Sequence, residues 1–263
     1  MDLQLDGKTA LVTGGSRGIG RAIARGLASE GARIAICART PEAVAATADQ
    51  LSRETGAEVV GLVADTGSRD AVVDLVARVT DRLGPVEILV NNAATAAGRS
   101  KPPALDQITR DALLAEVDVK VLGYLFAAQA VAPAMRDAGW GRIINIAGLA
   151  ARATGSIIGS IRNVSVGALT KNLADELGPS GITVNCVHPG LTRTVRSAES
   201  TDADEAALAA MIEERIPRSN SVRRMIDDLD LAPLVVFLAS PLSFVVNGES
   251  IDAGGGMPGT IRY

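Results

Sequence analysis

The chain has 263 residues, of which 47% are hydrophobic and 2% aromatic, and its formal net charge at pH 7 is −4. It is long enough to bury a substantial, mainly aliphatic core, and it has neither the basic tract of a nucleic-acid-binding protein nor the charge block of a disordered tail. We expect no signal or transit peptide, no membrane span and no metal site, and hence a cytoplasmic protein without nucleic-acid or membrane partners.

Residues 8–20 are the pattern around which the rest of the chain is organised. A short apolar run that ends at Thr13 is typical of a strand buried on both faces. A glycine-rich turn follows, and from Arg21 onward apolar residues recur at helical spacing. Glycines let a backbone approach phosphates closely, and a helix N-terminus offers free N–H groups with a partial positive charge. A glycine pattern alone is weakly specific, but its place between a first strand and a helix is the one that dinucleotide binding requires.

Strands and helices then alternate along the chain. Further strands are predicted at 33–38, 58–63, 86–90, 141–146, 181–187 and 249–253. Helices are predicted at 41–54, 68–83, 105–135 (broken near 109–110), 157–177 and 228–239. Residues 191–226 are polar, with one helical piece near 204–216. Seven strands alternating with helices, without a linker or an internal repeat, predict a single α/β domain with a doubly wound parallel sheet and helices on both faces.

The spacing Thr13-Gly14-x-x-x-Gly18-Ile19-Gly20 resembles that of the short-chain dehydrogenase/reductase family. Asn91-Asn92-Ala93-Ala94 is similar to the family's Asn-Asn-Ala-Gly signature, residues 229–256 resemble its C-terminal part, and the resemblance covers nearly the whole chain. It implies a Rossmann fold with strand order 3-2-1-4-5-6-7, a nicotinamide cofactor and an oxidoreductase that acts on a small molecule. It also implies a substrate flap at 191–226, and a homodimer or homotetramer formed through the two long helices and the last strand.

The resemblance further implies which residues contact the cofactor. They come from the glycine turn, from the ends of strands two, three and four, from the long helix at 157–177 and from the segment after strand six. These residues are Gly14, Ser16, Arg17, Gly18, Ile19, Gly20, Arg39, Asp65, Asn91, Ala93, Asn163, Pro189, Gly190 and Thr194.

The two cysteines, Cys37 and Cys186, fall in predicted strands two and six. In the strand order that the family implies, three strands lie between them. At ~4.8 Å per strand this separation is too large for a disulfide, so we expect both to be small core residues.

The end of the second strand indicates which nicotinamide cofactor is preferred. A carboxylate there would bind the ribose hydroxyls of NAD, whereas a cation would pair with the 2′-phosphate of NADP. Ala38 occupies the carboxylate position, Arg39 follows it, and Arg17 in the glycine turn can reach the same phosphate. Two arginines and no acid favour NADP, although ordinary solvated arginines would give the same pattern.

The resemblance breaks at the residues that carry the family's chemistry. Family members use a Tyr four residues before a Lys on one helix, a Ser after strand five and an Asn on the preceding long helix. With residues 166–177 aligned, this chain has Gly159 at the Tyr position, Asn163 at the Lys position, Gly148 at the Ser position and Lys120 at the Asn position. Losing a positioned acid costs about 10²–10⁴-fold in rate, so the ordinary ketoreductase mechanism is not expected.

Two of these changes are reciprocal, because Lys120 and Asn163 exchange the family's Asn and Lys between neighbouring helices. We hypothesise that the exchange keeps one cation and one amide near the nicotinamide ribose. Alternatively, Lys120 extends to solvent and Asn163 is a polar residue of the helix surface. His188, the only histidine, is a further candidate acid because imidazole titrates near neutral pH, although a residue at a strand end is more often structural.

Three functions therefore stay open. The first is an NADP-dependent oxidoreductase with an unconventional acid, or with a substrate that needs none, such as an iminium or an activated alkene. The second is a catalytically inactive cofactor-binding protein or partner subunit. The third is a non-redox enzyme, such as a lyase, that reuses the pocket. NADP binding is expected in all three.

Overall fold

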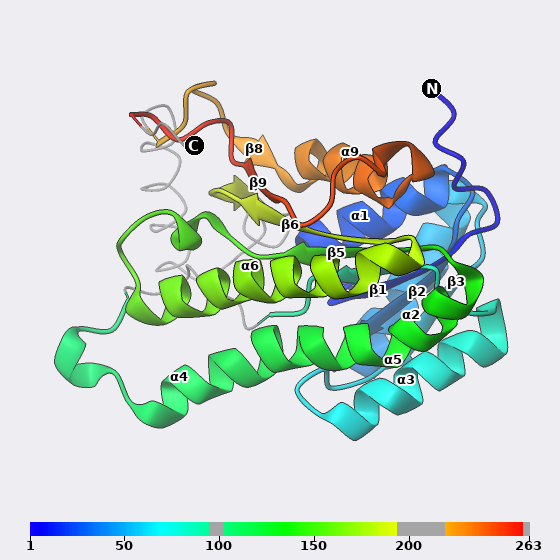
Figure 1. Ribbon diagram of the computed structural model, residues 1–263, viewed down its shortest axis with the longest axis horizontal. Coiled ribbons are helices and arrows are strands. Elements are labelled where there is room, and N and C mark those ends of the chain that lie inside the picture. Colours follow the sequence, from blue (N-terminus) through cyan, green and yellow to red (C-terminus); the bar gives the residue numbers. More distant parts are fainter. Residues whose placement is uncertain (95–101, 194–218, 260–263) are drawn as a thin grey trace.

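Parallel strands form a seven-stranded central sheet in the order β3-β2-β1-β4-β5-β6-β9 (Figure 1). The computed structural model describes residues 1–94, 102–193 and 219–259. The strands are β1 (Thr9–Thr13), β2 (Arg33–Ala38), β3 (Val59–Val63), β4 (Ile88–Asn91), β5 (Gly141–Ile146), β6 (Ile182–Pro189) and β9 (Ser250–Ala253). A separate two-stranded ribbon pairs β7 (Thr192–Arg193) with β8 (Ile226–Asp227). The predicted fold class and strand order are confirmed, with β9 as the predicted seventh strand.

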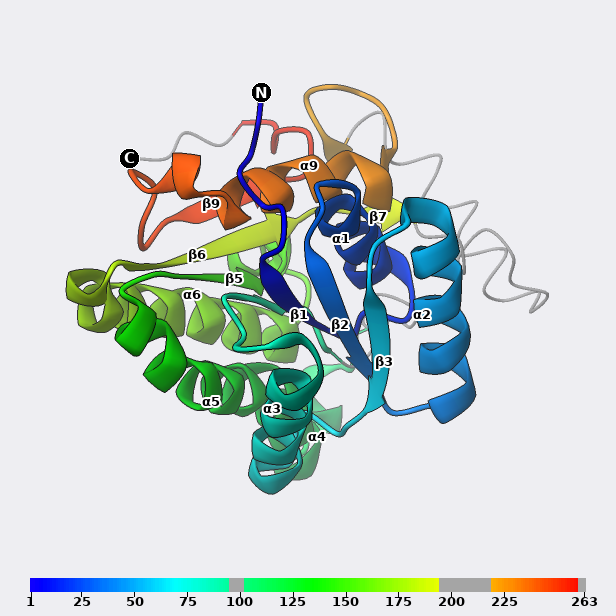
Figure 2. The same cartoon turned by 90° about the vertical axis from the view of Figure 1, so that its right-hand side faces the viewer.

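Helices cover both faces of this sheet (Figure 2). One face carries α1 (Gly18–Ser29), α2 (Pro41–Thr55) and α9 (Asp228–Ala239). The other carries α3 (Arg69–Leu83), α5 (Gly123–Ala138) and α6 (Ile157–Leu177). Single 3₁₀ turns lie at η1 (Leu105–Gln107), η3 (Leu149–Ala151), η4 (Gly178–Ser180) and η5 (Pro241–Ser243). This layering buries both faces of the sheet, as continuous apolar strands require.

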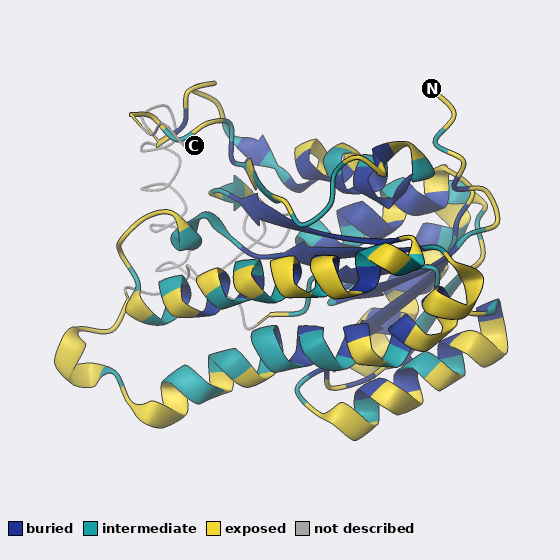
Figure 3. Cartoon of the chain, in the orientation of Figure 1, coloured by how far each residue is buried: buried dark blue, intermediate teal, exposed yellow. Residues whose placement is uncertain are grey.

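The core is aliphatic, as the composition predicts. Every residue of β1, β4, β5 and β6 is buried (Figure 3). Apolar side chains form two large clusters, one on each side of the sheet, and Tyr124 is the largest fully buried side chain among the described residues. Cys37 and Cys186 are buried free thiols on β2 and β6, which confirms the expectation for them.

The predicted long helix at 105–135 is divided more finely than expected. The break near 109–110 is confirmed, because α4 (Arg110–Val117) begins there and the Thr109 hydroxyl accepts a hydrogen bond from the Ala112 N–H at 3.1 Å. A π-helical turn, η2 (Asp118–Leu122), then joins α4 to α5. Such turns insert an extra residue into the helix and are frequent at functional sites. Lys120 lies in the middle of this turn and is buried.

The carboxyl ends of the parallel strands meet along one edge of the sheet, where α/β folds of this kind bind ligands. The glycine turn after β1 and the segments after β4, β5 and β6 all lie on this edge. Most of the predicted flap, including its helical piece at 204–216, and Thr194 fall outside the described residues, so these stay predictions. Within the three described ranges, no helix is long and apolar enough to cross a membrane.

Candidate functional site

The turn between β1 and α1 has the geometry of a phosphate-binding loop. Gly14 and Gly18 have φ angles of +65° and +52°, which side chains other than glycine's rarely tolerate. At Gly20 a Cβ would lie 2.4 Å from both the Asn92 Nδ2 and the Gly14 carbonyl oxygen. The turn is therefore packed too tightly for any side chain at this position, as a backbone cradle for a diphosphate requires.

The segment after β4 holds this turn in place. Asn92 Nδ2 donates to the carbonyl oxygens of Thr13 at 3.0 Å and Gly14 at 3.1 Å. The Thr13 hydroxyl oxygen accepts from the backbone N–H groups of Asn92 and Ala93 at 2.9 and 3.1 Å. Asn91 is buried, and its Nδ2 donates to Asn145 Oδ1 at 2.9 Å. The Asn-Asn-Ala segment thus joins the glycine turn to the central strands.

The first turn of α1 is open to an anion. Arg17 precedes the helix in an extended conformation without a side-chain cap, and no acidic residue lies in the first turn. Uncapped N–H groups at a helix N-terminus attract negative charge. The Ser16 carbonyl accepts a hydrogen bond from the Thr47 hydroxyl at 3.0 Å, which fixes the turn against α2. Arg17 and Arg39 are exposed, and neither makes an ion pair within the described ranges.

The remaining predicted cofactor residues lie at the same edge of the sheet. Asp65 follows β3, is exposed, and its Oδ1 accepts from the Gly67 N–H at 3.0 Å. Pro189 ends β6. A Cβ on Gly190 would lie 2.9 Å from the Gly254 Cα, so the segments after β6 and β9 touch here through glycine.

Three consecutive carbonyl groups at the end of β5 each bind a buried side chain. The Tyr124 hydroxyl donates to Ile146 O at 2.9 Å, and Lys120 Nζ donates to Ala147 O at 2.8 Å. His188 Nδ1 lies 3.1 Å from Gly148 O. These bonds fix the start of the loop in which the family carries its serine.

Lys120 is an ammonium group held in the interior, with an exposed fraction of 4%. Burial lowers its pKa to about 8, while the neighbouring Cys186 acts weakly in the opposite direction. A lysine with a pKa this low is partly neutral in mildly alkaline solution and able to exchange protons there. The alternative that Lys120 extends to solvent is therefore wrong.

Asn163 is equally buried, with an exposed fraction of 2%, so it is not a surface residue either. Its Nδ2 donates to the Gly159 carbonyl at 2.8 Å, and its Oδ1 has no hydrogen-bond partner among the described residues. Its amide lies beside Gly148, where a Cβ would be 3.4 Å from Nδ2. At Gly159 a Cβ would be 2.9 Å from the Ser156 Oγ, which caps α6. The Asn163 amide would thus be in ordinary contact with a side chain at position 148, whereas Ser156 would crowd a side chain at position 159.

His188 is fully enclosed, with an exposed fraction of 1%. Because a carbonyl only accepts, its Nδ1 carries the hydrogen that points to Gly148 O, and Nε2 faces the Cys186 Sγ at 3.4 Å. Burial raises the pKa of Cys186 to about 11, so the thiol stays protonated. It donates a hydrogen bond to Nε2. Both ring nitrogens are engaged, which favours the structural role for His188.

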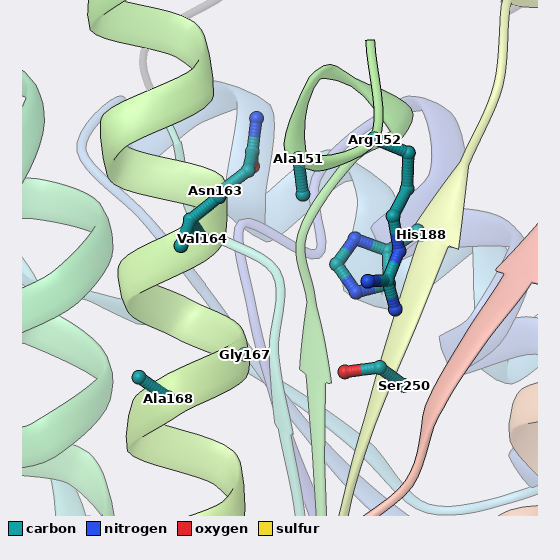
Figure 4. Close-up of a pocket in the computed structure, with 8 residues that line it drawn as sticks. All are labelled: Ala151, Arg152, Asn163, Val164, Gly167, Ala168, His188 and Ser250. Atoms are coloured by element: carbon teal, nitrogen blue, oxygen red, sulfur yellow. The ribbon is translucent and has the colours of Figure 1, made fainter. Parts of the chain in front are cut away.

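A pocket of about 230 Å³ lies between α6, the loop after β5, and strands β6 and β9 (Figure 4). Asn163 and Gly167 line it from α6, Arg152 from the loop, His188 from β6 and Ser250 from β9. In Figure 4, Asn163 projects from α6 toward the loop, and Arg152 and Ser250 lie on the opposite wall.

Of the three residues that hold the loop after β5, the sequence pointed to Lys120 and His188 as functional candidates but not to their role in holding the loop, and it did not point to Tyr124. Tyr124 follows Lys120 by four residues and His188 follows Cys186 by two, so each pair shares a face of its element. That spacing was the available signal. The sequence carried no signal for the π-helical turn or for the partly buried ion pair between Arg162 on α6 and Glu116 on α4.

Comparisons with known proteins agree with this geometry. Residues 8–205 match the protein family described as short chain dehydrogenase. The chain is 35% identical to a sorbitol dehydrogenase of Cereibacter sphaeroides, covering 97% of this chain and 98% of that protein. It is 37% identical to an uncharacterized short-chain type dehydrogenase/reductase of Sinorhizobium fredii, covering 96% and 98%. The crystal structure of L-sorbose reductase from Gluconobacter frateurii, complexed with NADPH and L-sorbose, superposes with a TM-score of 0.90 at 28% identity, covering 99% of this chain and 100% of that one.

Proposed function

The chain belongs to the short-chain dehydrogenase/reductase family, and from this premise we propose that it is an NADP(H)-binding oxidoreductase with an atypical active site. One observation carries the proposal: the glycine turn is tightly built, while Gly148 and Gly159 leave no hydroxyl where the family places its serine and tyrosine. The protein would hold the cofactor as its relatives do, but protonate its product differently or not at all.

The residues present fit a nicotinamide dinucleotide. The open first turn of α1 and the close approach at Gly20 suit the diphosphate. Asn163 Oδ1 is a buried acceptor that has no partner within residues 1–94, 102–193 and 219–259, which suits a ribose hydroxyl as donor. When bound, NADPH would supply a hydride to the substrate. Lys120 Nζ donates to Ala147 O at 2.8 Å and would keep a positive charge at the end of β5.

Two exposed arginines support NADP over NAD. Arg39 follows β2 directly and Arg17 precedes α1, so both lie beside the strand end where an adenosine ribose is read. No carboxylate occupies the strand end, because Ala38 is the last residue of β2. A guanidinium binds a phosphate through paired charged hydrogen bonds. NADP offers a 2′-phosphate at this position, whereas NAD has only a hydroxyl.

Replacing both Arg17 and Arg39 by Glu is expected to raise the dissociation constant of NADPH by about tenfold to a hundredfold, because one or two charged hydrogen bonds are lost. The dissociation constant of NADH is expected to change by less than about threefold. Fluorescence titration with both cofactors measures the two constants, with Arg53→Glu on α2 as the control. Equal loss of both cofactors would show that the arginines do not select the 2′-phosphate.

Two further functions stay open on the same geometry. Lys120 and His188 are both engaged with backbone carbonyls, so a substrate that needs no positioned acid, such as an iminium or an activated alkene, suits the oxidoreductase best. Tight NADPH binding without turnover on carbonyl and alkene panels would support an inactive cofactor-binding subunit instead. Substrate conversion without NADPH oxidation would support a non-redox enzyme. Turnover that is lost in Lys120→Ala or His188→Ala while NADPH binding is retained would support a role for that residue in turnover.

The exposed face of α6 supports a homo-oligomer. Ile157, Ile161 and Val164 lie on one side of the helix at helical spacing, and their exposed fractions are 50%, 43% and 54%. Contiguous exposed apolar side chains of this kind mark protein interfaces. We infer that a second copy of the chain packs on α6.

Ile161→Glu is expected to shift the assembly toward the monomer, because the interface would bury an unpaired charge. Sedimentation velocity across a range of protein concentrations measures the shift. Val73→Glu, on α3, is the matched control, since Val73 is exposed to a similar degree. If the two variants sediment alike, the interface does not use α6.

A further inference from the structure

Two buried cations and a partly buried carboxylate occur where α6 packs against α4 and η2. Arg162 is on α6, Lys120 is in η2, and Glu116 is on α4, four residues before Lys120. The exposed fractions of Arg162 and Lys120 are 6% and 4%. We propose that Arg162 is a positioning residue of the site: it holds the Glu116 carboxylate, so that Lys120 stays without a counter-ion and its ammonium stays on the loop after β5.

The spacing of Glu116 and Lys120 favours an ion pair between these two residues. Residues 110–138 form one continuous helical segment that comprises α4, η2 and α5, with helical backbone angles at both junctions. A glutamate four residues before a lysine is the favourable order for an ion pair on a helix, because the two side chains lie one turn apart. A buried ammonium also needs a partner, since it has lost its contact with water. Glu116 is therefore the expected counter-ion of Lys120.

The structure shows a different pairing. Arg162 Nη1 donates to Glu116 Oε2, and the two side chains have exposed fractions of only 7% and 20%. Lys120 Nζ forms no ion pair with any described residue and donates instead to Ala147 O at 2.8 Å. Arg162 thus binds the carboxylate that the helical spacing offers to Lys120.

The groups around Lys120 provide no second carboxylate to replace Glu116. The titratable groups on the surrounding elements are Glu116 on α4, Tyr124 on α5, Arg162 on α6, and Cys186 and His188 on β6, while Asp118 in η2 itself is exposed. Burial lowers the pKa of Lys120 to about 8, and Cys186 opposes this only weakly. Glu116 does not offset the effect of burial, as expected of a carboxylate that Arg162 already neutralises.

The role of Arg162 in the chemistry of the site rests on the proposed function, because that function places the loop after β5 beside the substrate. An ammonium without a counter-ion holds its proton less firmly, and here it donates to a carbonyl of that loop. If Glu116 were free, it would attract the ammonium and raise the pKa of Lys120, because an opposite charge within about 4–6 Å favours the charged form. Arg162 therefore keeps Lys120 on the loop and able to release its proton near neutral pH.

The test is the pKa of Lys120 in the cofactor-free protein, measured by NMR from the pH dependence of the ¹³Cε signals of labelled lysine. The chain has four lysines, and the signal of Lys120 is the one that Lys120→Met removes. Arg162→Met is expected to raise this pKa from about 8 to above about 9. The double variant Arg162→Met/Glu116→Gln removes the carboxylate as well, and it is expected to return the pKa to the wild-type value or below.

Two further substitutions of Arg162 separate its charge from its packing. Arg162→Lys keeps a cation for Glu116 and is expected to keep the wild-type pKa of Lys120. Arg162→Gln is measured beside Arg162→Met, with the same rise expected, so that the result does not depend on the folding of one variant. Arg136→Met is the matched control, because Arg136 on α5 pairs with Glu176 on α6 at the surface. It is expected to leave the pKa of Lys120 unchanged.

An unchanged pKa of Lys120 in Arg162→Met and Arg162→Gln would overturn the proposal, because Glu116 would then not be the alternative partner of Lys120. A rise that persists in the double variant would also overturn it, since the carboxylate would not be the cause. The measurement uses neither NADPH nor substrate. Failure of this inference is therefore distinguishable from failure of the proposed function, which the NADPH titration tests.

Discussion

Replacing Lys120 by Met is expected to stabilise the folded chain at pH 7 and to destabilise it at pH 10.5. The pKa of Lys120 is lowered from 10.5 to about 8 by burial. Below pH 8 the ammonium is charged in both states, and burying it costs roughly 3 kcal/mol, since each unit of pKa corresponds to about 1.4 kcal/mol. Between pH 8 and 10.5 the unfolded chain binds more protons than the folded one, so this cost is relieved as pH rises.

Methionine removes that cost but leaves Ala147 O without its donor, which costs about 1–3 kcal/mol. The substitution is therefore favourable at neutral pH and unfavourable once the lysine is neutral. Urea unfolding at both pH values, followed by the fluorescence of Trp140, the only tryptophan, measures the difference between variant and wild type. We expect that difference to fall by roughly 3 kcal/mol from pH 7 to pH 10.5.

Lys171→Met is the control, because Lys171 lies on α6 with its side chain exposed. Its difference from wild type is expected to change little over the same pH range. If the difference in unfolding free energy between Lys120→Met and wild type also stayed constant with pH, Lys120 would not be a buried ammonium. Its hydrogen bond to Ala147 O would then not explain the effect of the substitution.

Restoring the family's four residues is expected to raise ketone reduction by at least about a hundredfold, the lower bound for gaining a positioned acid. The variant carries Lys120→Asn, Gly148→Ser, Gly159→Tyr and Asn163→Lys. Positions 159 and 163 lie four residues apart on α6, so the tyrosine and lysine would share one face. A tyrosine Cβ at position 159 would lie only 2.9 Å from Ser156 Oγ. The variant therefore also carries Ser156→Ala, which removes this oxygen. NADPH oxidation with a simple ketone, followed by absorbance, gives the rate.

The control differs by a single oxygen atom: the same variant with Phe in place of Tyr at position 159. It should bind NADPH equally well and remain at the background rate. If the phenylalanine form reduced the ketone as fast as the tyrosine form, the acid in this site would not be the restored hydroxyl, and the missing tyrosine would not explain the chain's chemistry.

The sequence predicts the frame of the site well because that frame depends on local patterns. Glycines that need φ above zero, as at Gly14 and Gly18, and apolar strands between helices leave signals in the order of residues. The free thiols of Cys37 and Cys186 followed from their places in predicted strands two and six and from the strand order that the family resemblance implies. Each of these features depends on neighbours in sequence or on a topology that few alternatives satisfy.

The interior of the site could not be predicted in the same way. Lys120 lies buried in a π-helical turn. Nothing in the sequence of residues 118–122 indicates that the helix contains an extra residue there. A lysine is normally expected at the surface, and only its contact with Ala147 O, 27 residues away in the chain, shows otherwise. Likewise, Ser156 is an ordinary helix cap by sequence, and its proximity to Gly159 depends on the side-chain geometry of the first turn of α6.

We propose that the chain binds NADPH but lacks the groups that protonate a reduced carbonyl. The most direct test is one experiment on the wild-type protein: NADPH titration, followed by steady-state reduction of a simple ketone at saturating cofactor. We expect saturable binding with turnover below about 0.1 s⁻¹, since a typical enzyme rate near 10 s⁻¹ would fall at least a hundredfold without a positioned acid. Turnover near 10 s⁻¹ that persists in Lys120→Ala and His188→Ala would contradict it.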